Sequence, residues 1–171
     1  MVIQVAKSDV QPGDVQQPPR GVTRLRIAGI DFGTVRIGVA TADLEVGIAS
    51  PLENYTRRGE AADANYFRAL AADERIGRFV VGLPVHLDGR ESQKSTEARC
   101  FGEWLAQQTG VPVEYFDERF STSEAEHYLA VAQLSKKKRK ARLDKLAAQI
   151  MLTAYLETTH KRPEAPRGLD D

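Results

Sequence analysis

Cysteine is almost missing from this chain of 171 residues, since Cys100 is the single one. An internal disulfide is therefore excluded, and one thiol fits a reducing compartment, so we expect a cytoplasmic protein. Long apolar runs are missing as well, because no stretch approaches the roughly 18 uninterrupted apolar residues of a membrane helix. The N-terminal segment lacks the apolar core of a signal peptide. We therefore expect a protein without a disulfide framework and without a membrane partner.

The chain also lacks net charge, because 24 basic and 24 acidic side chains cancel. Net charge alone predicts no partner, so the distribution of charge has to be considered. Zinc-binding spacing is another absence: there is no CxxC or HxxxH, and the three histidines His86, His127 and His160 are scattered. This pattern argues against a zinc site.

The length suits one domain of ordinary size. Residues 1–23 and 161–171 show no periodicity and are expected to be flexible tails around a domain at 24–160. Within it, apolar alternation predicts strands near 25–31, 36–42 and 46–53, with FGTV as a hairpin turn between the first two. Helical and apolar spacing then predicts helices near 61–75, 92–110, 121–131 and 143–158, with strands at RFVVGLP and VPVEYF. Strands followed by alternating helices and strands predict a mixed α/β sheet.

Three segments carry acids at positions where an apolar residue would be energetically more favourable. Asp31 ends the apolar run RIAGID, and a buried carboxylate without a partner costs several kcal/mol in effective terms, so it is protonated, hydrogen-bonded or bound to a cation. Asp144 lies on the helical stripe of Ala148 and Tyr155, although an acid in a first turn also simply favours the helix dipole. Asp117 and Glu118 end a strand with side chains on opposite faces, and an ordinary ion-paired loop is the alternative there.

Such a cluster of acids needs a cation. Two unit charges about 4 Å apart repel by roughly 4 kcal/mol at an effective dielectric constant of 20. All-oxygen ligands suit Mg²⁺ or Mn²⁺, so we expect one of these divalent ions to be the cofactor.

Four motifs together carry a resemblance: DFGTVRIGVATAD, VVGLPVHLDG, DERFST and LDKLAAQIMLTAYLE. In this order and spacing, from about Arg24 to Glu157, the chain resembles the YqgF family, also called RuvX, of the ribonuclease H-like superfamily. Its members are described as pre-16S rRNA nucleases and as Holliday junction resolvase homologues. The resemblance implies a ribonuclease H-like α/β fold, with a five-stranded sheet in the order 3-2-1-4-5, strand 2 antiparallel, flanked by helices. It also implies Asp31, Glu118 and Asp144 as metal ligands, with Asp117 beside them in the catalytic group.

Nucleic acid is the expected partner because basic residues gather just before the last acid. This basic run comprises Lys136, Lys137, Lys138, Arg139, Lys140, Arg142 and Lys145. As a cationic loop it would hold a phosphate backbone, while the alternative is a solvated loop without a ligand. Arg36 and Arg119 are further candidates for phosphate contacts, with structural ion pairs to Asp43 or Glu118 as their alternative.

The expected activity is metal-dependent hydrolysis of phosphodiester bonds that leaves a 5′ phosphate. By resemblance, the substrate is the 5′ region of pre-16S rRNA, in ribosome biogenesis. The alternatives are a Holliday junction resolvase and a non-catalytic RNA-binding module. An actin-like ATPase also carries D-x-G-T but needs a second domain and a second phosphate loop. A monomer is favoured, with a dimer possible through Tyr128, Leu129 and Leu134, because the other apolar helix faces are expected to cover the sheet.

Overall fold

A five-stranded mixed sheet forms the centre of the molecule. The computed structural model describes residues 25–84, 92–117 and 136–160, and in the last of these segments it describes the side chains of 146–159. The strands are β1 (Arg26–Asp31), β2 (Arg36–Asp43), β3 (Ala49–Thr56), β4 (Ile76–Leu83) and β5 (Val113–Asp117). Their order is β3-β2-β1-β4-β5, with β2 antiparallel to both neighbours and β4 parallel to β1 and β5. This confirms the expected sheet.

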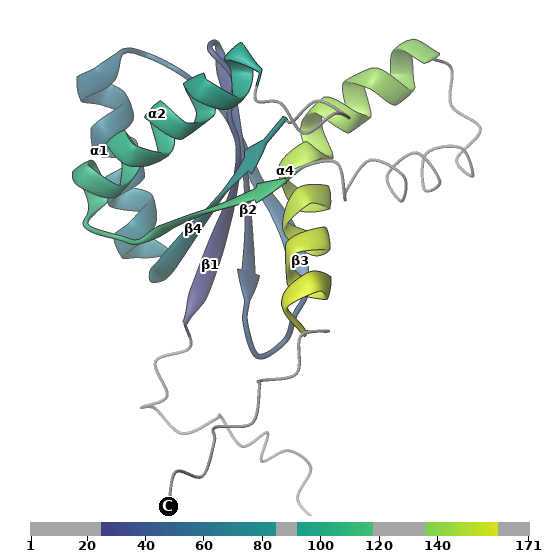
Figure 1. Cartoon of the computed structure of the whole chain (residues 1–171), viewed down its shortest axis with the longest axis horizontal. Helices are drawn as coiled ribbons and strands as arrows, with labels where there is room; N and C mark the ends of the chain where they lie inside the picture. Colours follow the sequence, from purple (N-terminus) through teal and green to yellow (C-terminus); the bar gives the residue numbers. More distant parts are fainter. Residues whose placement is uncertain (1–24, 85–91, 118–135, 161–171) are drawn as a thin grey trace, which may run out of the picture.

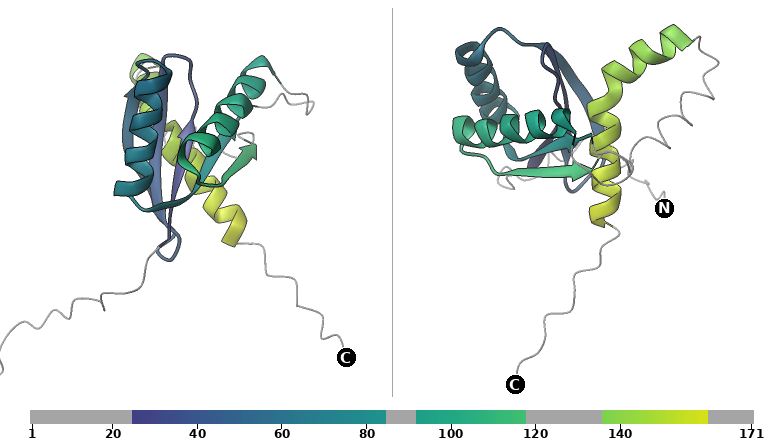
Figure 2. Two further views of the ribbon diagram at one scale, coloured as in Figure 1. Left: turned by 90° about the vertical axis from the view of Figure 1, so that its left-hand side faces the viewer. Right: turned by 45° about the horizontal axis from the view of Figure 1, so that its top comes forward.

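Helices cover both faces of the sheet. Helices α1 (Glu60–Asp73) and α2 (Gln93–Thr109) lie on one face, and α4 (Lys136–His160) crosses the other (Figure 1). The two rotated views show the same three layers (Figure 2). The ends of α2 follow the sequence, because Ser92 accepts a hydrogen bond from the Ser95 backbone N–H and Gly110 takes the left-handed C-cap conformation. None of the described helices is both long and apolar enough to cross a membrane.

Two apolar clusters make the core, one on each face. The alternation of β1 feeds both, because Ala28 and Ile30 join the cluster under α1 and α2 while Ile27 joins the cluster under α4. All three are fully buried. Each fully buried Ile contributes about 1.5 to 3 kcal/mol relative to exposure, so the two faces of one short strand anchor both helical layers.

The third strand begins three residues later than predicted, at Ala49. The carboxylate of Asp43 accepts hydrogen bonds from the backbone N–H groups of Glu45 and Val46, at 2.9 and 3.4 Å, and so holds a turn where the strand was expected. Gly47 follows with a φ of 70°. A short acidic side chain that binds its own backbone is a strong turn former, and its effect here outweighs the apolar pattern of Val46 and Ile48.

The prediction of a loop for the basic run is wrong. Helix α4 begins at Lys136, whereas the sequence pattern placed its start near Leu143. Lys, Arg, Ala and Leu are good helix formers, and residues 136–142 contain no glycine or proline to stop the helix. The predicted helix at 121–131 and both expected tails lie outside the described residues.

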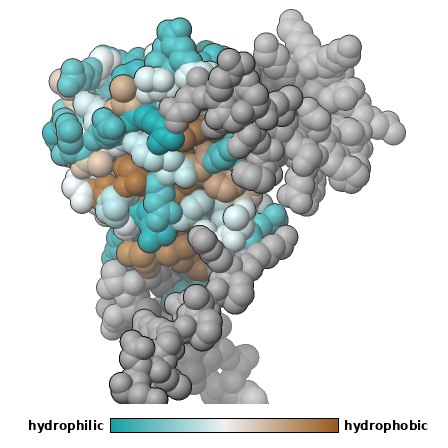
Figure 3. Space-filling model, viewed as in Figure 1, coloured by the Kyte–Doolittle hydropathy of each residue, from teal (hydrophilic) through white to brown (hydrophobic). Residues whose placement is uncertain are grey.

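Apolar residues remain exposed near the turn between β2 and β3. Val46 is 55%, Ile48 66% and Leu52 43% exposed. On the face seen in Figure 3, apolar atoms also show at the end of the sheet where this turn lies in Figure 1. Tyr128, Leu129 and Leu134, proposed from the sequence as a dimer contact, lie outside the described residues. Among the described residues, Val46, Ile48 and Leu52 therefore form a group of exposed apolar side chains near this turn.

A buried acid, Asp63, ties α1 to the end of β3. It is fully buried and accepts hydrogen bonds from the Tyr55 hydroxyl at 2.8 Å, the Arg58 backbone N–H at 2.9 Å and Arg57 Nε at 3.0 Å. Burial raises the pKa of Asp63, but the hydrogen bonds from Arg58, Tyr55 and Arg57 and the charge of Arg57 lower it, and the net pKa lies below its usual value. The ionised carboxylate is therefore the form that the fold stabilises.

We predict that Asp63→Asn lowers the free energy of unfolding by about 3 kcal/mol, because it leaves Arg57 without its counter-charge. Since the folded pKa is depressed, the contribution of Asp63 is complete above the usual Asp pKa and is lost as the pH falls through the folded value. Urea unfolding at several pH values measures both effects. Asp73→Asn, an exposed change on the same helix, should leave stability and its pH dependence as in the parent protein. Equal effects of the two variants would contradict this account.

Candidate active site

Asp31 lies at the edge of the sheet where the parallel strands end. It is the last residue of β1, and the ends of β4 and β5 lie at the same edge because the three strands are parallel. Ala28 and Ile30 face α1 and α2, so alternation places Asp31 on the opposite face, toward α4. The side chain is only partly buried. The acid that ends an apolar strand is thus explained by its place at this edge, where it faces a helix and reaches solvent.

Two glycines let α4 approach the sheet beside Asp31. A Cβ at Gly38, which pairs with Asp31 in the sheet, would lie 3.3 Å from Asp31 Cβ and 3.4 Å from Ala148 Cβ. A Cβ at Gly29 would lie only 2.8 Å from Leu152 Cβ. Larger residues at these two positions would push the helix outward. The two distances measured from Gly38 also show that Asp31 and Ala148 lie on either side of one point on the sheet.

Asp144 occupies the turn of α4 that precedes Ala148. Residues four apart lie on the same side of a helix, so the backbone of α4 places Asp144 one turn beyond Ala148, toward the edge at which β1 ends. The apolar stripe predicted below it is confirmed at Ala148, Met151, Leu152 and Tyr155, which are buried, whereas Ala147 is only partly buried. The side chain of Asp144 lies outside the described side chains.

The acids Asp117 and Glu118 lie at and after the end of β5. Asp117 is its last residue and pairs with Leu83. Tyr115 packs toward α2, whereas Phe116 joins the cluster under α4, so alternation places Asp117 on the α2 face. Glu118 lies outside the described residues. Asp31 and Asp117 are therefore at the same edge of the sheet but on opposite faces.

Among the described residues, no group of three or more His, Cys, Asp or Glu side chains is placed to hold a metal ion. Two of the three expected ligands, Glu118 and the side chain of Asp144, lie outside that part of the chain. The expected donors are all carboxylates, and Asp31 presents one beside the turn of α4 that carries another. This donor set suits a hard divalent cation such as Mg²⁺ or Mn²⁺.

Arg36 and the backbone of the basic run lie at the same edge. Arg36 begins β2, is exposed and lies near the end of β1. It cannot pair with Asp43, which ends β2 at the far side of the sheet. The first turns of α4, which carry Lys136, Lys137, Lys138, Arg139, Lys140 and Arg142, extend beyond the sheet at this edge (Figure 1). Arg119 lies outside the described residues.

A group of residues on the other face of the same edge was not predicted from the sequence. Phe32 directly follows Asp31 and stacks on Phe101 of α2, with ring centroids 4.8 Å apart. Arg57 lies over the Phe32 ring, 5.6 Å from its centroid. The sequence signals only the direction of Phe32, because continued alternation after Asp31 points it toward α2.

The family model and the relatives found by sequence place the chain in one family. The model of the RuvX family, described as Holliday junction resolvase, matches residues 25–158. A Rhodopirellula baltica protein named "Putative pre-16S rRNA nuclease" is 48% identical over 139 residues, covering 81% of this chain and 80% of that protein. An Anaeromyxobacter protein of the same name is 41% identical, covering 80% of this chain and 99% of that protein. The Thermus thermophilus RuvC structure with a Holliday junction substrate shares the fold, with a TM-score of 0.50, 15% identity and coverage of 80% of this chain and 96% of that one.

We predict that Gly29→Ala lowers the free energy of unfolding by about 1 to 3 kcal/mol, because the added methyl group meets the Leu152 Cβ and forces α4 away from β1. Chemical denaturation measures the loss. The matched control is Gly77→Ala in β4, where the three atoms nearest to the added methyl group all belong to the side chain of Leu25, which is 48% exposed and can rotate away. A control as destabilised as Gly29→Ala would show that close helix approach is not the cause.

Proposed function

Because the chain belongs to the RuvX family, we propose that it is a divalent-metal-dependent endonuclease that hydrolyses phosphodiester bonds in precursor 16S rRNA in the cytoplasm. The family and the named nuclease relatives support nuclease activity on nucleic acid. The choice of precursor ribosomal RNA follows the names of those relatives. The metal is proposed because the candidate ligands are all carboxylates, which suit a hard divalent cation.

One observation carries the proposal: Asp31 Cβ and Ala148 Cβ both lie within 3.4 Å of the position that a Cβ would take at Gly38. The helix turn that contains Asp144 is therefore next to the strand end that contains Asp31. The backbone of residue 144 and the strand end at Asp31, more than a hundred residues apart in the sequence, thus lie at one edge of the sheet, as does the exposed Arg36. Two carboxylates that start from neighbouring backbone positions suit a shared divalent cation, which would offset their mutual repulsion.

Asp31, Asp144 and Glu118 are the residues that would hold the metal. Asp117 lies on the α2 face of β5, so the next residue, Glu118, is the better candidate for the α4 face on which Asp31 lies. When bound, divalent ions would supply activation of a water molecule and stabilisation of the leaving 3′ oxygen. The oxygen of water then forms the new bond to phosphorus and the bond from phosphorus to the 3′ oxygen breaks, which leaves a 3′ hydroxyl and a 5′ phosphate.

The basic start of α4 and Arg36 would position the substrate. Both lie at the carboxyl edge of the sheet, and seven basic side chains within ten residues form a cationic segment of helix. Neutralising phosphates with Lys and Arg releases counterions and gives binding that does not depend on base sequence. These residues hold the phosphate backbone of the RNA while the acids act on one phosphodiester bond.

A Holliday junction resolvase is the second candidate, because the family is described by that activity and the fold is shared with a resolvase bound to a junction. Resolving a four-way junction requires two coordinated sites, in practice a symmetric dimer. We favour a monomer, although Val46, Ile48 and Leu52 offer an exposed apolar surface. Cleavage of precursor 16S rRNA and of a four-way junction, compared side by side with light scattering, decides between the two. Paired symmetric nicks made by a stable dimer would favour the resolvase.

We predict that Asp31→Asn and Asp144→Asn each reduce metal-dependent cleavage by about a thousandfold, because several kcal/mol of metal-derived stabilisation is lost. Removing one of several repelling carboxylates should not destabilise the metal-free protein. Thermal melts with and without Mg²⁺ should show stabilisation by the metal in the parent protein but not in these variants. Asp73→Asn is the matched control, exposed on α1, and should keep both activity and the metal response. Full activity of either Asp31→Asn or Asp144→Asn would disprove the proposed centre.

We predict that changing Lys136, Lys137, Lys138, Arg139 and Lys140 to Gln weakens RNA binding regardless of base sequence. Each lost phosphate contact should reduce the slope of log affinity against log salt by about 0.7 for a single strand. Fluorescence anisotropy of a labelled RNA over a series of salt concentrations measures the slope. Arg68→Gln with Arg75→Gln, two exposed changes away from this edge, should leave it unchanged. An unchanged slope in the five-residue variant would return the basic run to a solvated helix end.

A further inference from the structure

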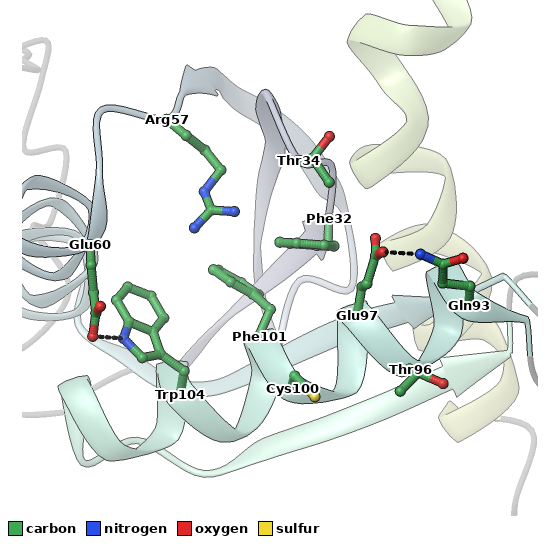
Figure 4. Close-up of a pocket in the computed structure, with 10 residues that line it drawn as sticks. All are labelled: Phe32, Thr34, Arg57, Glu60, Gln93, Thr96, Glu97, Cys100, Phe101 and Trp104. Atoms are coloured by element: carbon green, nitrogen blue, oxygen red, sulfur yellow. Dashed lines mark hydrogen bonds between the residues drawn. The ribbon is translucent and has the colours of Figure 1, made fainter.

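An aromatic hollow lies across the sheet from Asp31, between the β1–β2 turn and helices α1 and α2 (Figure 4). Its volume is about 600 Å³. This size is within the range of small-molecule sites, which is about 300 to 1,000 Å³. Three rings line it, Phe32, Phe101 and Trp104, and the polar side chains around them include Thr34, Arg57, Glu60 and Glu97.

The three rings form a continuous row. Phe32 stacks on Phe101 at 4.8 Å with an interplanar angle of 27°, and Phe101 contacts Trp104 at 5.4 Å and 35°. Phe101 is 5% exposed, whereas Phe32 and Trp104, at the two ends of the row, are only partly buried. Partly exposed aromatic rings beside a hollow are the surface on which an unstacked base gains stacking energy.

Arg57 is fixed over these rings by the buried Asp63. Its Nε donates to Asp63 at 3.0 Å, and its guanidinium carbon lies 5.6 Å from the Phe32 centroid and 6.0 Å from the Phe101 centroid. Asp63 balances the charge of Arg57, so Glu60 and Glu97 leave the surroundings of the hollow net negative. This charge disfavours a phosphate and favours a neutral, flat ligand that stacks.

The position of the hollow connects it to the acids. Phe32 directly follows Asp31, and alternation points the two side chains to opposite faces of the same sheet edge. A single-stranded RNA that crosses this edge of the sheet can place a phosphate beside Asp31 and a neighbouring base beside Phe32. We propose that the aromatic hollow binds one unpaired nucleobase of the RNA substrate, close to the bond that is cut. The inference rests on the proposed nuclease function.

The carboxylate of Glu97 also favours some bases over others in the hollow. The carboxylate of Glu97 points toward Phe32 (Figure 4) and accepts a hydrogen bond from Gln93 at 3.0 Å, which leaves it further acceptor capacity. A carboxylate accepts from the exocyclic amino group of a base, as it does from cytosine N4. Adenine, cytosine and guanine are therefore favoured over uracil in the hollow.

Trp104 is the single tryptophan of the chain, so its fluorescence reports on the hollow alone. The experiment uses the full chain with EDTA, which prevents cleavage, and a labelled single-stranded RNA spanning the mature 5′ end of 16S rRNA. Anisotropy measures binding, and selective excitation of tryptophan measures stacking. The bound RNA should quench Trp104. An abasic nucleotide at one position near the cleavage point should remove the quenching and weaken binding roughly tenfold, with a smaller loss for uracil there. Binding without quenching would overturn the proposal.

Trp104→Leu and Tyr66→Leu separate the hollow from general effects of losing an aromatic residue. Tyr66 stacks on Tyr55 outside the hollow and serves as the matched control. In Trp104→Leu, the abasic nucleotide should cost nothing further, whereas Tyr66→Leu should keep the tenfold loss. The same abasic penalty in all three proteins would refute the base site. The parent protein's fluorescence decides the question even if Trp104→Leu fails to fold.

The same materials separate this inference from the proposed function. RNA that is cut with Mg²⁺ but shows no position-dependent quenching would disprove the hollow and leave the nuclease standing. RNA that quenches Trp104 at one position but is never cut would support the hollow as a binding site and disprove the nuclease. RNA that is neither bound nor cut would disprove both.

Discussion

The close approach of α4 to the β1–β2 hairpin is the constraint on which the rest of the structure depends. Gly29 and Gly38 leave no Cβ between the strands and the helix, and Ala148 keeps the helix side of this contact small. A helix that packs through small residues has little freedom to shift along the sheet, since interiors are close-packed. Its next turn, which carries Asp144, is thereby held at the strand end that carries Asp31. Packing in the core fixes the register of the two acids.

The fold was largely predictable because its signals are local and mutually consistent. The alternation of β1 predicts that strand, and the cap at Ser92 and the glycine at Gly110 predict the two ends of α2. All three signals agree with the observed fold. The start of β3 was not predictable from apolar pattern alone, because the side chain of Asp43 binds two backbone N–H groups and holds a turn. The start of α4 was missed because clustered charge was taken as a sign of a loop, although Lys and Arg are good helix formers.

The candidate site was predictable only in part. An acid at the end of an apolar strand, such as Asp31, stands out in the sequence because its cost in a core is large. An aromatic residue such as Phe32 does not stand out, because burial explains it equally well. Only the fold shows that Phe32, Arg57 and Trp104, from three separate segments, surround one hollow. The local sequence does not show that ordinary residues from distant segments come together in the fold. It does show a charged residue in an apolar strand, because burying such a residue is energetically unfavourable.

The basic start of α4 has an electrostatic cost. The first turn of a helix favours acids, and each cation there costs about 0.3 to 1 kcal/mol at low ionic strength. The first turn of α4 contains no acid, and its first residues are Lys136, Lys137 and Lys138. The mutual repulsion of these charges adds to that cost. A phosphate backbone along the basic run would reverse both effects, because it brings negative charge to the positive end of the helix dipole. In the proposed function, RNA bound along the basic run would therefore stabilise the same helix that carries Asp144.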